Sequence, residues 1–384
     1  MKIFWIVQKD LLHDLDSATW IEPSKILKEN GSQVVLIYSA QKKSLFRNQF
    51  LEDNSRAIKV INFFPFLSIS FHIQIFFRML FWLFSEKPNV VITHPITALF
   101  IVPAIILSKL AGLKCKFVLD IRTLPVGSFG ISGKIKKRII NLSIFAGNLF
   151  FDGVTVITPA LKRVIIERFK IRSEKIGIWG SGVNMDLFQP EKRKDAFPNK
   201  AFTILYHGVI AENRGILETA QAMEIISKNY ADIQLKIIGT GPGRDKLEKF
   251  IRDRKLQNCV KLLPPVPQAE IPGYVQTANC GILPLPDYEY WRISSPLKLF
   301  EYLAMSKPVL ASQIEAHSSV LKNCPAGIFI SSVSPEGIAD AIIATNLKRS
   351  QLKDWGEAGR KLVMHNYTWQ HQTEKLEKYL NNLT

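Results

Sequence analysis

Short runs of apolar, β-branched residues alternate with longer amphipathic stretches, and this alternation occurs twice along the chain. In the first half the short runs predict strands at Ile3–Val7, Val34–Tyr38, Val90–Thr93, Lys116–Leu119 and Gly153–Ile157. Stretches with helical character lie between them, for example Ser24–Glu29 and Thr97–Ala111. This pattern is typical of a parallel sheet covered by helices.

The segment Gly180–Asn199 is rich in Gly, Pro, Asn and charge, which indicates a linker. After it the alternation restarts, with predicted strands at Thr203–Tyr206, Gln234–Ile238, Val260–Leu262, Cys280–Leu283 and Pro308–Ala311. Helices are predicted at Gly215–Asn229, Arg244–Arg254, Leu297–Met305 and Pro335–Thr345. A chain of 384 residues accommodates two such domains, which would bind ligands at the carboxyl ends of their strands, facing an interdomain cleft.

The charge balance points to an anionic partner. The chain has 50 Lys and Arg against 33 Asp and Glu, a net charge of +17. Nucleic acid, an anionic membrane surface and a phosphorylated small molecule all fit such a charge. Nucleic acid is the least favoured, because the basic residues are spread out and no motif combines stacked aromatic and basic residues.

Two features bear on location. Cys115, Cys259, Cys280 and Cys324 have no metal-ligand spacing, and the N-terminus has no long apolar core of a signal peptide, which together favour a reduced, cytoplasmic setting. The apolar stretch Phe63–Phe84 contains Pro, His, Gln and Arg, which are unusual in a spanning helix. It is either a buried helix or a surface helix that dips into a bilayer, with nearby Lys and Arg on lipid headgroups.

Two glycine-containing loops follow predicted strands in the second half. Ile238–Arg244 has Arg244 where a dinucleotide fingerprint has its third glycine, so it is either a plain strand-to-helix turn or a close approach to a ligand by Gly239, Gly241 and Gly243. In the loop Leu205–Gly215, Arg214 begins a helix, where the helix dipole disfavours a cation. This position favours binding of a phosphate by Arg214 over simple solvation.

The segment Ser294–Ser312 combines a helix opening with charged residues on an otherwise apolar helix. Ser-Ser-Pro predicts a helix start with Ser as the cap and Pro in the first turn. Glu301 is a natural acceptor for the two hydroxyl groups of a ribose, and Lys298 is placed for a phosphate.

Candidate residues in the first half end predicted strands. Asp120 and Arg122 form either a local ion pair or one side of the cleft near a reacting sugar, and His94 is either a cleft residue or a loop histidine. The Asp-Leu-Asp triplet 14–16 matches a metal-binding DxD, but a helix cap explains it better.

Five segments together resemble the GT-B fold glycosyltransferases of family 4, which are retaining enzymes, over nearly the whole chain. The segments are GSGVNMDLFQP (Gly180–Pro190), YHGVIAENRGI (Tyr206–Ile216), IIGTGPGRDKLE (Ile237–Glu248), SPLKLFEYLAMSKPVLAS (Ser295–Ser312) and YTWQ (Tyr367–Gln370). The resemblance implies an acceptor-binding domain over 1–184, a donor-binding domain over 185–368 and a final helix, 369–384, that packs back on the first domain.

The resemblance also implies roles for residues of this sequence. Catalysis would involve Asp120, Arg214 and Lys298, with His94 and Arg122 on the acceptor side of the cleft. The donor, a UDP- or GDP-sugar, would be bound by Gly208, Arg214, Gly239, Gly241, Pro265, Val266, Ser294, Ser295, Leu297, Lys298 and Glu301. No metal is required, because protein cations would carry the phosphate charge.

The sequence departs from the family pattern at defined places. Ile293 stands where the first of two glutamates is usual, and Val209 stands where an Arg is common. Many relatives have a His at the position of Asp120, and the usual glycine pair is absent from QKDLLHDLDS (8–17). We therefore expect sugar transfer to a lipid-linked or surface polysaccharide acceptor at an anionic membrane, with a catalytically weak partner subunit and a nucleic-acid-binding protein as alternatives.

Overall fold

The computed structural model describes residues 1–11, 17–40, 49–60, 66–125, 130–191 and 201–384. The chain forms two compact units. Unit 1 comprises Met1–Ser181 and Trp369–Thr384, and unit 2 comprises Gly182–Thr368. Each unit has its own parallel sheet covered by helices, which is the doubly wound architecture that the alternation predicted.

The sheet of unit 1 has seven parallel strands in the order β3-β2-β1-β4-β5-β6-β7. The strands are β1 (Lys2–Val7), β2 (Gln33–Ala40), β3 (Ser55–Lys59), β4 (Val90–Thr93), β5 (Lys116–Ile121), β6 (Gly153–Val156) and β7 (Ile176–Ile178). The order reverses between β1 and β4, and the carboxyl ends of strands beside such a switch point form the ligand-binding edge of α/β sheets.

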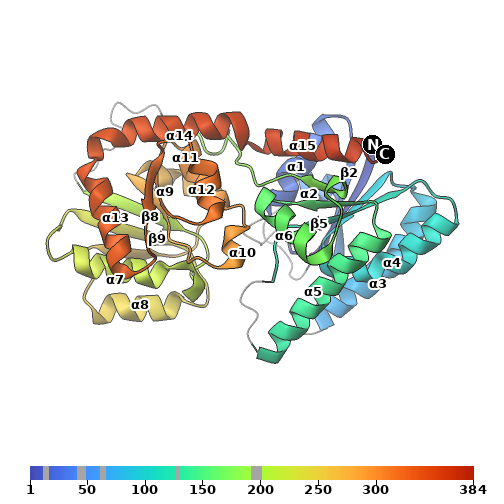
Figure 1. Ribbon diagram of the computed structural model, residues 1–384, viewed down its shortest axis with the longest axis horizontal. Coiled ribbons are helices and arrows are strands. Elements are labelled where there is room, and N and C mark those ends of the chain that lie inside the picture. The colour runs from blue at the N-terminus through green and yellow to red at the C-terminus, as the bar shows by residue number, and fades with distance from the viewer. Residues whose placement is uncertain (12–16, 41–48, 61–65, 126–129, 192–200) are drawn as a thin grey trace. The chain divides into compact units, whose positions relative to one another are not determined.

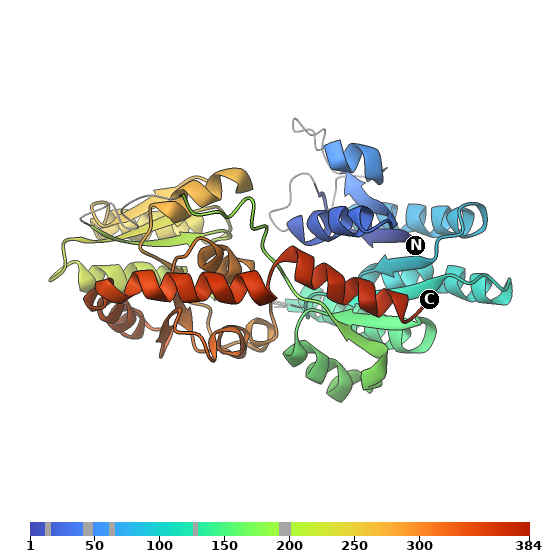
Figure 2. The same cartoon turned by 90° about the horizontal axis from the view of Figure 1, so that it is seen from above.

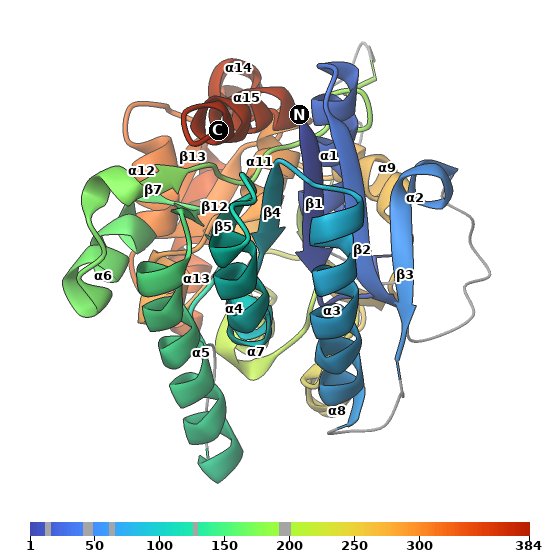
Figure 3. The same ribbon diagram turned by 90° about the vertical axis from the view of Figure 1, so that its right-hand side faces the viewer.

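The helices of unit 1 cover both faces of this sheet. They are α1 (Ala18–Glu29), α2 (Gln49–Asn54), α3 (Phe66–Ser85), α4 (Pro95–Leu110), α5 (Gly130–Phe150) and α6 (Pro159–Phe169). Right-handed crossovers from β3 through to β6 place α3, α4 and α5 on one face of the sheet. Figure 3 shows these three helices side by side in front of the strands.

The last helix, α15 (Trp369–Asn381), belongs to unit 1 and packs against α1 and β7 (Figures 1 and 2). The Tyr379 hydroxyl accepts a hydrogen bond from the Val154 N–H at 2.9 Å and donates one to the Lys175 carbonyl at 2.6 Å. The Gln372 Oε1 atom accepts from the Gly180 N–H at 2.8 Å. The final helix therefore completes the first unit.

The sheet of unit 2 has six parallel strands in the order β10-β9-β8-β11-β12-β13. They are β8 (Phe202–His207), β9 (Ile233–Ile238), β10 (Val260–Leu263), β11 (Cys280–Leu283), β12 (Val309–Ser312) and β13 (Gly327–Ile330). The helices are α7 (Ile216–Ile226), α8 (Arg244–Asp253), α9 (Ile271–Gln276), α10 (Glu289–Arg292), α11 (Leu297–Ala304), α12 (Glu315–Leu321), α13 (Pro335–Leu347) and α14 (Leu352–Asn366).

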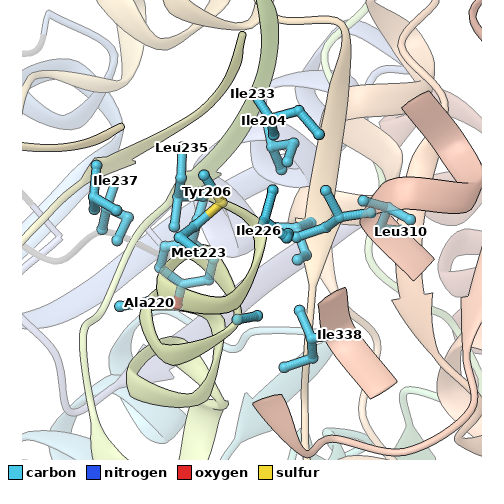
Figure 4. Close-up of a cluster of buried hydrophobic side chains, with 14 of the residues drawn as sticks. Ile204, Tyr206, Ala220, Met223, Ile226, Ile233, Leu235, Ile237, Leu310 and Ile338 are labelled. Carbon is cyan, nitrogen blue, oxygen red and sulfur yellow. The ribbon is translucent and has the colours of Figure 1, made fainter. Parts of the chain in front are cut away.

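The main core of unit 2 fills the space between its sheet and the helices α7 and α13 (Figure 4). Ile204 and Ile237 face it from the central strands, and Met223 and Ile338 face it from the two helices. Full burial of each such side chain stabilises a fold by about 1.5–3 kcal/mol. This core packs against β8 and β9 and holds both strands in place. The loops at their carboxyl ends therefore begin at fixed positions.

The sequence analysis did not predict three of the strands, which are β3, β7 and β13. All three lie at the edge of a sheet, where only one side is paired. β7 has three residues, and β3 (SRAIK) has only Ala57 and Ile58 between charged residues on a half-exposed edge. β3 and β7 lack the continuous apolar run that marks a buried parallel strand, whereas β13 (GIFI) is apolar and as long as other strands that were predicted.

Candidate functional site

The loops that follow β8 and β9 are packed against each other at the carboxyl edge of the second sheet. The Gly208 N–H donates to the Ile238 carbonyl at 2.8 Å, and the Ile210 N–H donates to the Thr240 carbonyl at 2.9 Å. Gly239 has φ +147°, and a Cβ atom there would overlap the Gly208 carbonyl oxygen. The glycines of this turn are therefore required for loop-to-loop packing at the place where a ligand would be bound.

Arg244, which replaces the third glycine of a dinucleotide fingerprint, has a structural position. Its Nη1 atom donates to the Gly239 carbonyl at 2.5 Å and to the Leu263 carbonyl at 2.8 Å. Arg244 thereby ties the glycine turn to the start of the segment Leu263–Val266. Within that segment Pro265 is exposed, and Val266 packs against the second hydrophobic core of the unit.

α11 begins at Leu297, as predicted, but its N-cap differs from the prediction. Pro296 occupies the N-cap position and makes no side-chain cap, so the predicted Ser cap is wrong. The Ser294 hydroxyl instead donates to the Trp291 carbonyl at 2.8 Å, at the end of α10. The Ser294 hydroxyl is thus bonded to the preceding one-turn helix.

Lys298, in the first turn of α11, lies directly over the backbone of Gly208. A Cβ atom at Gly208 would lie 2.7 Å from the Lys298 Nζ atom. Burial and, to a smaller extent, the positive charge of Arg214 lower the pKa of Lys298 to about 8, against the opposing effect of Glu301. An ammonium group held at a strand end with little solvation is suited to a phosphate, which restores the lost charge stabilisation.

Glu301 lies one turn further along α11 and is 7% exposed. Burial raises the pKa of its carboxyl group to about 7, although Lys298 and a hydrogen bond from Gln268 act in the opposite direction. Its Oε2 atom is 3.4 Å from Nε2 of His207, the last residue of β8.

Sequence reasoning assigned no role to His207. Burial, with a smaller contribution from Lys298, holds the pKa of His207 well below its usual range, so the ring is neutral. The contact with Glu301 is therefore not an ion pair. Its Nε2 atom is buried and makes no hydrogen bond to any described residue. The only sequence signal for this residue was its position at the end of a strand, directly before Gly208.

Arg214 is the third charged residue of this group, with Lys298 and Glu301. It ends the 3₁₀ turn Glu212–Arg214, and its guanidinium stacks 4.7 Å from the centre of the Trp291 ring. The Trp291 Nε1–H donates to the Asn213 carbonyl at 2.8 Å, which anchors the ring to the same loop. Trp291 also escaped sequence analysis, because only the tertiary fold brings α10 onto this loop.

Unit 2 therefore brings Gly208, Arg214, Lys298 and Glu301 together at the carboxyl end of β8. Ile293, where the family has its first glutamate, is 3% exposed and apolar. Of the other predicted donor residues, Ser294 caps α10, Leu297 begins α11, and Ser295 is partly buried between them. Two cations and a carboxyl group in this arrangement can bind an anion together with neighbouring hydroxyl groups.

In unit 1, Asp120 lies inside β5 and is 2% exposed. Its Oδ1 atom accepts hydrogen bonds from the Thr155 hydroxyl at 2.8 Å and from the Trp179 indole N–H at 3.2 Å. Burial raises the pKa of this carboxyl group, and Arg122 counteracts the effect. The Arg122 guanidinium stacks 3.9 Å from the centre of the Trp179 ring and donates to the Trp179 carbonyl.

His94 follows β4 and is the N-cap residue of α4. Its Nε2 atom accepts a hydrogen bond from the Gln8 N–H at 3.0 Å, which requires the unprotonated ring. Burial, with the charges of His72 and Lys9, lowers its pKa to about 3. The Asp-Leu-Asp triplet 14–16 lies outside the described residues.

Two family models match adjacent parts of the chain. The model described as "Glycosyltransferase Family 4" matches residues 22–187, and the model described as "Glycosyl transferases group 1" matches residues 188–362. Among solved structures, a glycosyltransferase from Rickettsia africae has a TM-score of 0.75 at 18% identity, over 100% of this chain and 98% of that chain. An Anabaena protein solved with UDP and glucose has a TM-score of 0.74 at 13% identity, over 99% of each chain.

Curated relatives match shorter stretches. The amylovoran biosynthesis glycosyltransferase of Erwinia amylovora is 29% identical over 180 residues, which are 47% of this chain and 43% of the relative. The phosphatidyl-myo-inositol mannosyltransferase of Mycobacterium tuberculosis is 26% identical over 194 residues, which are 49% of each protein. These matches span about half the length of the relatives.

Proposed function

We propose that this chain, which belongs to the family 4 glycosyltransferases of the GT-B fold, transfers a sugar from a nucleotide-sugar donor with retention of anomeric configuration. The observation that carries the proposal is the pair Lys298 and Glu301 on α11. Both side chains lie at the carboxyl end of β8 with perturbed pKa values, beside Arg214. Charged groups held under desolvation in this way occur mainly at binding and catalytic sites.

The two cations account for the diphosphate part of the donor. Cleavage of a glycosyl–phosphate bond leaves a nucleoside diphosphate, and fixed positive charges lower the barrier by stabilising the departing charge. Arg214 and Lys298 supply these charges in the proposal, so no metal ion is required. Transfer that continues in excess EDTA would support this part, and a strict requirement for a divalent cation would contradict it.

The carboxyl group accounts for the nucleoside part. Glu301 would accept hydrogen bonds from both ribose hydroxyls, and the backbone of Leu263–Val266 would line the pocket for a uracil or guanine base. Asp120, Arg122 and His94 remain predictions for contacts with the sugar or the acceptor, and no covalent role is assigned to Asp120.

The acceptor in the proposal is a lipid-linked or surface polysaccharide at the cytoplasmic face of an anionic membrane. Relatives named for amylovoran, teichuronic acid and phosphatidyl-myo-inositol support an acceptor of this kind. The net charge of +17 suits both the donor phosphates and anionic lipid headgroups.

A thermal-shift panel of nucleotides and nucleotide sugars tests the proposal, because a ligand that binds only the folded state stabilises it by about 2.7 kcal/mol at one hundred times its Kd. We expect UDP- or GDP-sugars to raise the melting temperature, and Glu301→Ala and Arg214→Ala each to abolish the shift. The site assignment is wrong if both variants keep the wild-type shift. Donor hydrolysis without acceptor distinguishes the enzyme from a catalytically weak partner subunit.

A further inference from the structure

Large apolar side chains are exposed mainly on one face of unit 1. Of the eighteen that are exposed in the described residues, fourteen lie on α3, α4 and α5. Unit 2 has the other four, at Ile225, Tyr288, Leu347 and Met364. Single exposed apolar residues are ordinary on a soluble protein, but a continuous patch of this size marks a surface that binds something.

The stripe on α3 is the most exposed part of this face. Ile69, Ile73, Phe77, Phe81 and Phe84 recur at helical spacing, and Phe77 and Phe81 are 64% and 67% exposed. Residues three or four positions apart share one side of a helix, so all five point away from the sheet together. This helix thus presents a row of aromatic and aliphatic side chains that the fold itself leaves uncovered.

The neighbouring helices continue the stripe. On α4 the exposed large apolar residues are Phe100, Ile106, Leu107 and Leu110, the last at 80% exposure. α4 contacts α3 on one side and α5 on the other, and all three lie on the same face of the sheet (Figure 3). The exposed residues of the three helices therefore form one apolar surface, here called the α3–α5 face.

The α5 helix adds positive charge to the apolar surface. Ile135, Ile139, Leu142, Phe145 and Leu149 are its exposed apolar residues, at helical spacing. Its first turns carry Lys134, Lys136, Lys137 and Arg138, all of which are exposed. Figure 3 shows this end of α5 extending beyond α4. The lysines and the large apolar residues near this end are alike exposed.

The charged residues within α3, α4 and α5 are all basic, and one of them, Lys109, pairs at 3.5 Å with Asp152, which follows α5. The sequences of α3, α4 and α5 contain no Asp or Glu, whereas they contain six Lys and Arg residues. A protein interface usually combines charges of both signs at its rim, but an anionic bilayer offers an apolar interior under a negative surface. The combination of apolar stripes with only basic residues matches that surface.

Length and composition alone would allow α3 to cross a membrane at Leu67–Ser85, but its packing favours a helix that lies flat. Phe71, Ile75 and Met79 are fully buried under the exposed stripe. His72 Nε2 is 3.1 Å from the Thr97 hydroxyl of α4, and burial lowers the pKa of this ring to about 4. A spanning position would remove this cover from the sheet and place Arg78 in lipid.

We propose that the α3–α5 face is a monotopic membrane-binding surface, which inserts its apolar side chains among the acyl chains of an anionic bilayer and places the lysines of α5 on the headgroups. The inference rests on the membrane part of the proposed function and assigns it a surface. It differs from adsorption by charge alone, because apolar insertion persists when salt screens the charges.

Co-sedimentation of the full chain with vesicles of phosphatidylcholine and phosphatidylglycerol (7:3) tests the proposal. We expect wild-type binding to persist in 0.5 M NaCl, and the double variant Phe77→Ser/Phe81→Ser to lose about tenfold or more in partition coefficient. Leu347→Ser, on the exposed side of α13 in unit 2, is the matched control and should bind as wild type. Lys136→Glu/Lys137→Glu should weaken binding to these vesicles about tenfold and leave binding to pure phosphatidylcholine unchanged.

Three outcomes would overturn the inference. One is wild-type protein that stays in the supernatant, and another is a Phe77→Ser/Phe81→Ser variant that binds as wild type. The third is a dimer in analytical ultracentrifugation without vesicles that the same double variant dissociates, which would assign the face to a second copy. Nucleotide-induced thermal shifts on the same samples keep the two proposals separate, because the double variant should retain them whether or not the face binds lipid.

Discussion

The two units share a parallel α/β topology. They differ in that unit 2 buries charged groups at the edge of its sheet, whereas unit 1 exposes apolar side chains on its helices. At the carboxyl edge of the second sheet, Lys298, Glu301 and His207 are held near one another under desolvation. At the corresponding edge of the first sheet, Asp120 and His94 accept hydrogen bonds from their own unit. The first unit instead leaves apolar helix faces uncovered.

This difference indicates a division of tasks between similar frameworks. Unit 2 holds charged groups whose ionised forms are disfavoured by burial and would be stabilised by a bound ligand, which is a feature of preorganised binding sites. Unit 1 uses its polar strand-end residues to fix its own backbone and offers an apolar, basic exterior. The predictions below test whether nucleotide binding is confined to unit 2 and how rigidly each unit holds its polar residues.

The largest expected effect concerns the cations of unit 2. A charge-assisted hydrogen bond contributes about 1.5–3 kcal/mol, so Arg214→Ala/Lys298→Ala should weaken nucleotide binding by about one hundredfold to ten-thousandfold. Arg122→Ala, which removes a cation from unit 1, should change the affinity for UDP or GDP, which carry no transferred sugar, by less than about twofold. Isothermal titration with UDP and GDP measures both variants, and an equal loss from Arg122→Ala would contradict the confinement of nucleotide binding to unit 2.

Asp120 should affect the stability of unit 1 by an intermediate amount. Asp120→Ala leaves the Thr155 hydroxyl and the Trp179 indole N–H without their shared acceptor, which costs about 2–4 kcal/mol in free energy of unfolding. Asp120→Asn keeps an acceptor oxygen and should fold normally. Denaturant unfolding measures the free energy of unfolding of both variants. An Asp120→Ala protein with wild-type stability would contradict the structural role of Asp120.

The Asp120→Asn variant tests the direction in which Asp120 makes the free energy of unfolding depend on pH. Because burial raises the folded pKa, the stability that Asp120 contributes is full below the unfolded pKa of about 3.9 and is lost as the pH rises through the folded value. The stability of Asp120→Asn relative to wild type should therefore increase as the pH rises. If its kcat also falls with unchanged stability and KM, Asp120 contributes to the chemistry as well.

The pH dependence of donor affinity should be about tenfold or less. A nucleotide sugar whose ribose hydroxyls donate to the ionised Glu301 binds more tightly as the pH rises through the free pKa of about 7. A donor that prefers protonated Lys298 binds more weakly as the pH rises through about 8. We expect maximal affinity for a UDP- or GDP-sugar between about pH 7 and 8, and loss of the acidic limb in Glu301→Gln. A flat profile for wild type would remove the ionisation argument for unit 2.

Much of the second unit followed from local sequence, because its central strands are continuous apolar runs and its site lies on one short helix. Its edge strand β13 did not follow, although its four residues (GIFI) are apolar and other strands of that length were predicted. The Ser cap of α11 was wrong because Ser294 donates to the Trp291 carbonyl instead. A cap depends on the competing partners nearby, and those come from tertiary structure.

The residues that sequence reasoning missed share one property. His207 and Trp291 acquire their roles from neighbours distant along the chain, Glu301 for the first and Arg214 for the second. For the same reason, the sequence alone could not decide whether the stretch 63–84 binds a membrane. Composition could not distinguish a buried helix from a surface helix, whereas the packing of α3 shows that one side is buried and the other exposed.

The smallest expected effect concerns Trp291, which holds Arg214 in place without binding the nucleotide itself. A cation–π contact contributes about 0.5–1 kcal/mol at a partly exposed site, so Trp291→Leu should weaken donor binding only about twofold to fivefold. Trp291→Phe keeps a ring face and should recover most of the loss, although it removes the hydrogen bond to the Asn213 carbonyl. In an Arg214→Ala background the Trp291→Leu change should have no further effect, because its contribution passes through the guanidinium. An additive loss in the double variant would instead make Trp291 a direct contact of the donor and widen the binding surface of unit 2.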